Sequence, residues 1–168
     1  MKVLVSGAEQ RPYSFERYPD VEVVRHPLPS GDYSLPGMHE GGPISIAIER
    51  KELNDLIACL MGSNRERFER ELMRGRSFDV FVVVVEATLL EVSRGEYRSG
   101  MNSHAAIQSI LALQLRHRIS FIWAGDRSGG EYVTYSLLVK YLYEIRKRHE
   151  ASVKEQDSKA IVRPSKGA

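Results

Sequence analysis

Short apolar runs fill the first fifty residues of the chain. The runs at residues 2–6 and 21–25 are rich in β-branched residues, and a polar stretch with Pro12 and Pro19 lies between them. This pattern predicts two strands joined by a loop or a short helix. The segments GDYSL and PISIAIE are also strand-like, and PGMHEGG between them supplies the Gly and Pro of a turn. We therefore predict a hairpin over residues 31–49.

The apolar spacing becomes helical after Lys51. Leucine, isoleucine and phenylalanine recur near helical spacing as far as Gly75, and residues 62–64 mark a point at which this helix can be interrupted. Residues 80–86 hold valine at five of seven positions. Such a run is typical of a central strand that is covered on both faces.

A polar loop with Gly95 and Gly100 follows this strand. Asn102 or Ser103 is a candidate cap for the next helix, whose broad apolar surface runs to Leu115. The segment ISFIWAG predicts a last strand. Apolar positions from residue 131 to about 148 then predict a last helix.

These elements follow one another in the order β, β, β-β, α, β, α, β, α. A hairpin beside strands joined by helical crossovers predicts an α/β fold with three layers, in which helices flank a central mixed sheet. A chain of 168 residues is long enough for one such domain and too short for two. We assign residues 1–149 to this domain. Residues 150–168 lack apolar periodicity, so we expect a basic, disordered tail there.

The formal net charge of +2 hides an uneven distribution. From Arg146 onward there are seven Lys or Arg and three acidic residues, a net +4, which leaves −2 for the preceding residues. Such a tail is either a solvated extension or an electrostatic attachment to nucleic acid, and the sequence leaves both open. No apolar run is long enough for a membrane helix or a signal peptide, so we expect a soluble protein with no membrane partner.

Three charges, Glu49, Arg50 and Lys51, stand at the end of the apolar run at residues 44–48. Side chains alternate along a strand, so Glu49 and Lys51 are expected on one face and Arg50 on the other. Asp32 begins the partner strand of the hairpin and can bring a second carboxylate close to Glu49. Two converging carboxylates suit Mg²⁺ or Mn²⁺. Lys51 beside such a metal can orient a water molecule or offset charge on a phosphate during phosphodiester hydrolysis.

Each of these short motifs also has a purely structural interpretation. The triplet can be an exposed strand end, and Gly31-Asp32 can be an ordinary turn. Taken separately, short motifs have high false-positive rates. Their combination at one predicted hairpin favours a site.

With these residues the sequence resembles the nuclease domain of the XPF-type structure-selective endonucleases. The signature of that family is G-D, a variable stretch, and E-R-K-x-x-x-D. It corresponds here to Gly31-Asp32, the sixteen residues 33–48, and Glu49-Arg50-Lys51 with Asp55. The resemblance covers roughly residues 1–148. It implies a restriction-endonuclease-like fold, metal-dependent cutting of branched or flapped DNA in repair or recombination, and a homodimer or heterodimer formed through this domain.

The resemblance also assigns roles to residues. It implies that Asp32 and Glu49 are metal ligands, that Lys51 is the catalytic lysine, and that Arg50 and Asp55 support the site. Asp55 lies in the first turn of a predicted helix, where the helix dipole alone also favours an acid, so both roles stay open.

The first strand departs from the family pattern V-D-x-R-E. Ser6 stands in place of the aspartate and Ala8 in place of the arginine, whereas Val5 and Glu9 fit. A serine hydroxyl is a weaker, neutral ligand. Glu9 is therefore a candidate third metal ligand, and an exposed loop carboxylate is the alternative.

Arginines after residue 64 are candidates for contact with the DNA backbone. Arg67, Arg70 and Arg74 are expected on one helical face, although interleaved glutamates such as Glu66 make a self-paired, solvated helix an equal alternative. No G-x-x-x-x-G-K-[ST] motif is present in the sequence, so no ATP is implied.

The leading hypothesis is thus a magnesium- or manganese-dependent DNA endonuclease. The rival is a catalytically silent DNA-binding or scaffold subunit, in which Ser6 in place of the aspartate indicates the loss of activity. Action on RNA or on unstructured single strands is a third hypothesis. Tyr132, Tyr141 and Tyr143 widen the apolar face of the last helix, which motivates a homodimer, with ordinary core packing as the alternative. The expected location is the cytoplasm or nucleoid, or the nucleus of a eukaryotic cell.

Overall fold

The computed structural model describes residues 1–37 and 45–161, with side chains described as far as residue 154. Within these residues six strands form one sheet in the order β2-β1-β3-β4-β5-β6. The strands are β1 (Lys2–Ser6), β2 (Glu22–His26), β3 (Tyr33–Ser34), β4 (Ile46–Glu52), β5 (Val80–Glu86) and β6 (Ser120–Trp123). β3 is antiparallel to both of its neighbours, whereas the other neighbouring pairs are parallel. The predicted mixed sheet is confirmed.

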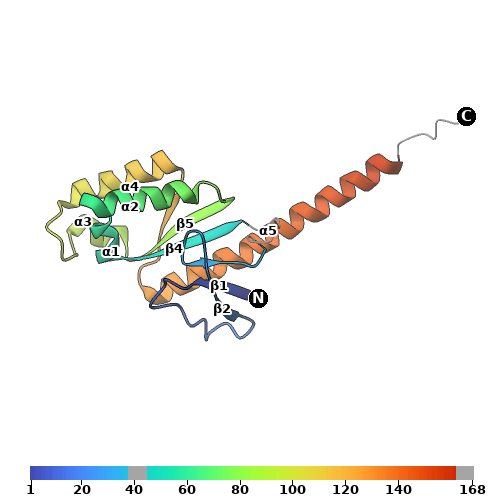
Figure 1. The fold of residues 1–168 in the computed structure, drawn as a ribbon, viewed down its shortest axis with the longest axis horizontal. Coiled ribbons are helices and arrows are strands. Elements are labelled where there is room, and N and C mark those ends of the chain that lie inside the picture. The colour runs from blue at the N-terminus through green and yellow to red at the C-terminus, as the bar shows by residue number, and fades with distance from the viewer. Residues whose placement is uncertain (38–44, 162–168) are drawn as a thin grey trace, which may run out of the picture.

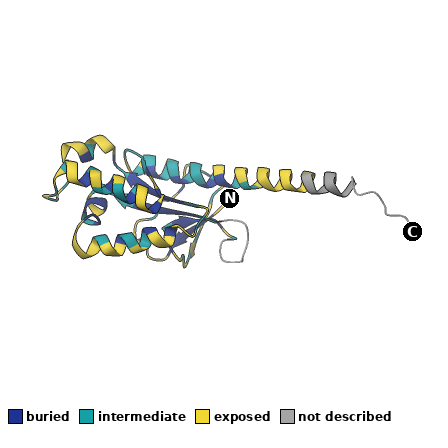
Figure 2. Cartoon of the chain, turned by 90° about the horizontal axis from the view of Figure 1, so that it is seen from above, coloured by how far each residue is buried: buried dark blue, intermediate teal, exposed yellow. Residues whose placement is uncertain are grey.

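Helices cover both faces of this sheet (Figure 1). They are α1 (Leu53–Ala58), α2 (Gly62–Gly75), α3 (Leu89–Arg94), α4 (Ser103–His117) and α5 (Arg127–Ile161). α1 to α4 lie over one face, where they form a core with side chains such as Leu56 and Phe68. α5 and the loop after β1 close the other face around Tyr13 and Leu138. The predicted three-layer α/β fold is therefore confirmed, and Figure 2 shows the buried residues concentrated between the layers.

The strand β5 belongs to both cores. Val83 and Val85 pack toward α1 to α4, and Val82 and Val84 pack toward α5. This alternation confirms the prediction of a central strand with two covered faces. β4 follows the same rule, because Ala47 faces the first core and Ile48 the second.

Two helices differ from the prediction. The segment expected to be one helix up to Gly75 is divided into α1 and α2, and the break lies at residues 59–61 instead of 62–64. The expected loop after β5 contains α3, which begins at a capping box in which Thr88 and Glu91 satisfy each other's backbone N–H groups. The pattern T-x-x-E was the local signal for this helix.

The N-terminal cap of α4 and the pairing of the hairpin agree with the sequence prediction. Asn102 caps α4, because its side chain accepts a hydrogen bond from the backbone N–H of Ala105. β3 and β4 are paired antiparallel, as the predicted hairpin requires. Residues 38–42 of the predicted turn, PGMHEGG, lie outside the described residues.

α5 continues to Ile161, whereas the sequence predicts its end near residue 148. Helix formers such as Ala, Glu, Lys and Gln occupy residues 149–161, and the next Pro or Gly is Pro164, so nothing local ends the helix earlier. The extension projects from the body of the molecule (Figure 1). No described helix is both long and apolar enough to cross a membrane.

Candidate active site

The charged triplet lies near the end of β4, directly before its last residue, Glu52, and β4 lies between β3 and β5 in the sheet. Glu49 and Lys51 form an ion pair on the face of the sheet covered by α1 and α2, where the Lys51 ammonium also lies 5.3 Å from the centre of the Phe68 ring. Arg50 points to the other face, where its guanidinium lies 5.8 Å from the centre of the Tyr13 ring. The predicted alternation is confirmed. It places a carboxylate and an ammonium on one surface.

The backbone of β4 positions Asp32. The Asp32 N–H donates to the Ile48 carbonyl at 2.8 Å, and the Arg50 N–H donates to Oδ2 of Asp32 at 2.8 Å. Gly31 has a φ of +79°, and a Cβ atom there would lie 3.1 Å from the Ile48 carbonyl oxygen. Only glycine meets both conditions without strain. The Gly31-Asp32 pair is therefore a structural requirement for bringing this carboxylate to the end of β4.

Arg50 is the centre of a buried ionic network. Its Nε and Nη2 donate to the two carboxylate oxygens of Glu86, each at 2.7 Å. Nη2 also donates to Glu52 at 2.8 Å, and Nη1 donates to Glu9 at 3.4 Å. Burial lowers the pKa of Arg50, but the bonds to Glu86 and Glu52 outweigh it and raise the pKa overall. Arg50 therefore stays charged and connects the ends of β4 and β5 to the loop after β1.

Burial governs the protonation of the two central carboxyl groups. It raises the pKa of Asp32 to about 6, against the lowering effect of the Arg50 N–H. It also raises the pKa of Glu49 well above its usual range, against the lowering effect of Lys51. For Lys51, burial acts to lower the pKa, but Glu49 and Glu71 raise it overall. The site thus contains acids that are costly to ionise without a further cation.

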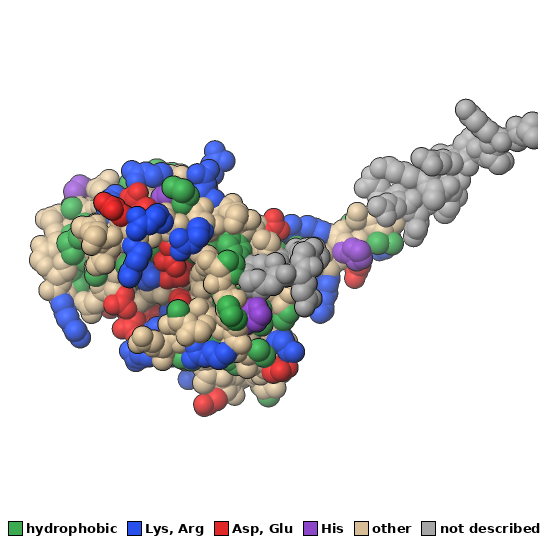
Figure 3. Space-filling model, in the orientation of Figure 1, with side chains coloured by type: hydrophobic (Ala, Val, Ile, Leu, Met, Phe, Trp, Pro, Cys, Tyr) green, Lys and Arg blue, Asp and Glu red, His purple; other side chains and the backbone are tan. Residues whose placement is uncertain are grey.

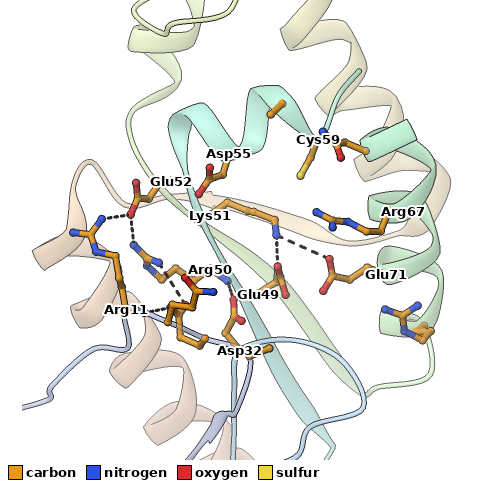
Figure 4. A pocket seen from close by; sticks show the side chains of 16 residues that line it. Arg11, Asp32, Glu49, Arg50, Lys51, Glu52, Asp55, Cys59, Arg67 and Glu71 are labelled. Atoms are coloured by element: carbon orange, nitrogen blue, oxygen red, sulfur yellow. Dashed lines mark hydrogen bonds and ion pairs between the residues drawn. The ribbon is translucent and has the colours of Figure 1, made fainter. Parts of the chain in front are cut away.

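A hollow of about 770 Å³ opens over these groups. Figure 3 shows acidic side chains recessed below a rim of basic ones, and Figure 4 shows the lining side chains. The hollow is lined by Asp32, Glu49, Arg50, Lys51, Asp55 and Glu9 of the predicted site, by Ala8, Gln10, Arg11 and Glu52, and by Ala58, Cys59, Asn64, Arg67, Glu71 and Arg74. The six residues predicted as catalytic from the sequence therefore border one space.

The three arginines predicted on one face of α2 separate in the structure. Arg67 and Arg74 line the hollow, and neither has an ion-pair partner among the described residues. Arg70 is not part of the lining and pairs instead with Glu66, 4.0 Å away on the solvent side. The reason is helical geometry, since positions 67 and 74 are two turns apart whereas position 70 is rotated away from them.

Glu9 and Ser6 are held by neighbouring residues of the first loop. Glu9 accepts hydrogen bonds from the backbone N–H of Arg11 at 2.6 Å and from Arg50. Ser6 Oγ accepts from the Ala8 N–H at 3.2 Å. Arg25 donates to the carbonyls of Ser6 and Glu9, both at 2.7 Å, and so pins the loop. Glu9 is buried rather than exposed, and its role as a metal ligand stays a prediction.

Sequence reasoning missed three acids that pair with Arg50 or Lys51, namely Glu52, Glu71 and Glu86. Glu86 lies beside Glu52 in the β4–β5 register, so strand pairing alone brings it to Arg50. Glu71 reaches the site from α2, with its Oε2 atom 4.0 Å from the Lys51 Nζ atom. The position of Glu86 follows from the end of a valine strand, but Glu71 has no local signal because charged residues recur throughout α2.

The donor set is suited to a hard divalent cation. Among the described residues, no group of three or more His, Cys, Asp or Glu side chains is arranged to hold a metal ion. Asp32 and Glu49 therefore offer two carboxylates, at the base of an open hollow. Mg²⁺ is commonly bound by one or two carboxylates together with water and substrate phosphates. The residues fit such an ion.

Comparison with known proteins supports this picture of the fold. The model of the ERCC4 domain matches residues 6–156 of the chain. Among solved structures, XPF from Aeropyrum pernix is similar with a TM-score of 0.64 and 24% sequence identity, covering 93% of this chain and 70% of that chain. Its complex with DNA is similar with a TM-score of 0.60 and 24% identity, covering 85% of this chain and 66% of that chain. No curated protein sequence matches the chain.

Proposed function

From the fact that the chain belongs to the ERCC4 domain family, we propose that it is a divalent-metal-dependent DNA endonuclease. The proposed reaction is hydrolysis of phosphodiester bonds in branched or flapped DNA during repair or recombination. DNA is the proposed polymer because a structural relative, XPF from Aeropyrum pernix, is known in complex with DNA. Arginines at the rim of the hollow, around acidic side chains at its bottom, also suit a DNA substrate with its phosphate backbone.

One observation carries this proposal. Glu49 and Lys51 form a buried ion pair beside Asp32, at the base of a hollow wide open to solvent. Burying three ionisable groups at a strand end costs free energy that pairing offsets only in part, so their presence there favours a functional role. Two acids and one ammonium at the same place are the groups that phosphodiester hydrolysis requires.

Asp32 and Glu49 are the proposed ligands of Mg²⁺ or Mn²⁺. When bound, the ion supplies Lewis acidity and lowers the pKa of a water molecule. Lys51 places a positive charge where negative charge develops on the phosphate, and the water oxygen forms the new bond to phosphorus as the ester oxygen leaves with a proton. Arg50 holds Asp32 through its backbone N–H and anchors the surrounding acids through its guanidinium.

The substrate backbone is proposed to lie along α2. Arg67 and Arg74 line the hollow two helical turns apart and can contact successive phosphates. Asp55, exposed in the first turn of α1, borders the same space and is proposed as a supporting residue. No role for ATP is proposed.

A second function remains a candidate because of Ser6. Its hydroxyl is occupied by the Ala8 N–H and offers no charge to a metal. A catalytically silent DNA-binding or scaffold subunit would retain the fold and the arginine rim without turnover. Asp32, Glu49 and Lys51 are all present at the bottom of the same hollow, which favours an active enzyme over a silent subunit.

The test is cleavage of flap, fork and four-way junction DNA with Mn²⁺, with linear duplex for comparison. We expect Lys51→Ala to lower the rate about 10²- to 10³-fold, because it removes a group that stabilises developing charge. Lys140→Ala, at an exposed position of α5, is the matched control and should cleave at the wild-type rate. Equal rates for wild type and Lys51→Ala, or no cleavage by the wild type, would refute the enzyme.

A further inference from the structure

Glu71 lies on the side of α2 that faces the end of β4 (Figure 4). Arg67 and Arg74, four residues before it and three after it, are the positions at which a helical acid ordinarily finds a partner. Yet the ion pair of Glu71 within the described residues is made across the hollow with Lys51, at 4.0 Å. Glu71 is thus directed at the strand instead of at its own helix.

The other acids of α2 behave differently. Glu66 pairs with Arg70, and Glu69 pairs with Arg65 and Arg116. None of these five residues lines the hollow. Of the acids on α2, Glu71 alone enters the hollow, where its side chain is 23% exposed. Glu71 lies between Arg67 and Arg74 on its own helix and pairs with neither, which suggests that it has a role at the site.

Lys51 has two carboxylate partners among the described residues, Glu49 and Glu71. Glu49 is also a proposed metal ligand, so its oxygens cannot serve the ammonium fully once a divalent cation is bound. That cation also repels Lys51 electrostatically. Glu71 belongs to another element, and its pairing with Lys51 survives the change.

We infer that Glu71 is a positioning residue that keeps the Lys51 ammonium over the base of the hollow while a divalent cation is held by Asp32 and Glu49. This inference rests on the proposed function, because it concerns the geometry of that same site. Glu71 acts through Lys51 and contacts neither the cation nor the phosphate. Its charge, rather than its shape, carries the effect.

A first experiment measures cleavage by Glu71→Gln, Glu71→Asp and the control Glu66→Gln with saturating Mn²⁺. We expect Glu71→Gln to lower kcat about 10- to 100-fold, less than the loss of a direct donor. KM for DNA should stay within about twofold, and the calorimetric Kd for Mn²⁺ should change by less than tenfold, as expected of a residue that acts through Lys51 instead of as a ligand. Glu71→Asp, which keeps the charge, should recover part of kcat, and Glu66→Gln should match the wild type.

A second experiment needs no turnover, so it separates this inference from the proposed function. Acetylation of Lys51 by an amine-reactive ester is followed by mass spectrometry with and without Mn²⁺. Without metal, Glu49 still pairs with Lys51 in all variants, so Glu71→Gln should change the rate less than it does with metal. With saturating Mn²⁺, Lys51 should react at least about threefold faster in Glu71→Gln than in wild type or Glu66→Gln, the effect of one lost ion pair.

The two experiments fail in different ways. The wild-type protein can bind Mn²⁺ and protect Lys51 through Glu71 and yet fail to cut DNA. That result refutes the proposed function and leaves the positioning role of Glu71 intact. Equal Lys51 reactivity in wild type and Glu71→Gln with Mn²⁺ overturns the positioning role. A Kd for Mn²⁺ weakened tenfold or more by Glu71→Gln also overturns it, because Glu71 would then be a metal ligand.

Discussion

At the scale of one residue, the buried Asp32 carboxyl group lowers the free energy of unfolding of the protein at neutral pH. Burial raises its pKa to about 6, whereas an unfolded chain ionises an aspartate near pH 4. Between these values the folded protein holds a proton that the unfolded chain has released. Stability therefore falls as pH rises through this window, and the loss persists at neutral pH.

We predict that Asp32→Asn stabilises the metal-free protein at pH 7 by about 1–2 kcal/mol, because a neutral amide has no charge to bury. The amide oxygen can still accept the Arg50 N–H. Urea unfolding at pH 7 and at pH 4 measures the effect, which should nearly vanish at the lower pH. Asp20→Asn, at an exposed position, is the control, and an Asp32→Asn protein no more stable than wild type at pH 7 contradicts the prediction.

At the scale of elements, the hairpin geometry depends on Gly31. Its φ of +79° and the 3.1 Å that would separate a Cβ atom from the Ile48 carbonyl oxygen leave no room for a side chain. We predict that Gly31→Ala destabilises the protein by about 1–3 kcal/mol and weakens Mn²⁺ binding, since Asp32 moves with the backbone. Thermal unfolding and calorimetry test both effects.

Gly100→Ala is the matched control for this change. Nothing lies within 4 Å of a Cβ atom at Gly100, so that variant should unfold and bind Mn²⁺ like the wild type. If Gly31→Ala behaves like Gly100→Ala, the strand end does not require glycine.

The helix α2 carries the second prediction at this scale. Arg67 and Arg74 line the hollow, whereas Arg70 pairs with Glu66 outside it. We expect Arg67→Ala and Arg74→Ala each to weaken DNA binding and to reduce the salt slope of log K by about one, because each removes one phosphate contact.

Fluorescence anisotropy over a range of salt concentrations, with Ca²⁺ in place of Mn²⁺, measures these slopes. Arg70→Ala is the control on the same helix and should leave the slope unchanged. A slope reduced equally by all three substitutions would mean that the arginines act only through overall charge.

At the scale of the whole molecule, α5 presents aromatic side chains to solvent. Tyr132 and Tyr143 are 63% and 59% exposed, and Tyr143 borders a hollow that Val139 and Leu142 line together with charged side chains such as Arg146. Tyr141, also assigned to this surface from the sequence, is instead buried and donates its hydroxyl hydrogen to Asp79. The exposed face is still broad enough to motivate a dimer.

We predict a homodimer in light scattering at micromolar concentration, and we predict that Tyr143→Glu shifts it to the monomer, since a charge in an apolar contact is left unpaired. Leu115→Glu changes a residue that is 81% exposed on α4, on the opposite face of the sheet, and serves as control. A wild type of monomer mass at that concentration, or dissociation by Leu115→Glu alone, contradicts this surface.

Much of the fold and part of the site could be predicted from the sequence. The period of two along β4 decided that Glu49 and Lys51 share a face, and the valine run of β5 decided that both faces of the sheet are covered. These features depend on local geometry alone. The capping box of α3 was equally local, and the helical composition after residue 148 carried α5 further than its apolar stripe indicated.

The identity of the partners was decided only by the tertiary structure. Glu71 meets Lys51 because of how α2 packs against the sheet, and Glu86 meets Arg50 because of how β4 and β5 are aligned. A charged residue in a sequence can pair with any of several others nearby. Long-range packing selects one of them, since burial makes an unpaired charge costly at one place and harmless at another. The sequence by itself therefore determined which residues are candidates for the chemistry, and the packing of α2 against the sheet determined which of them lie together.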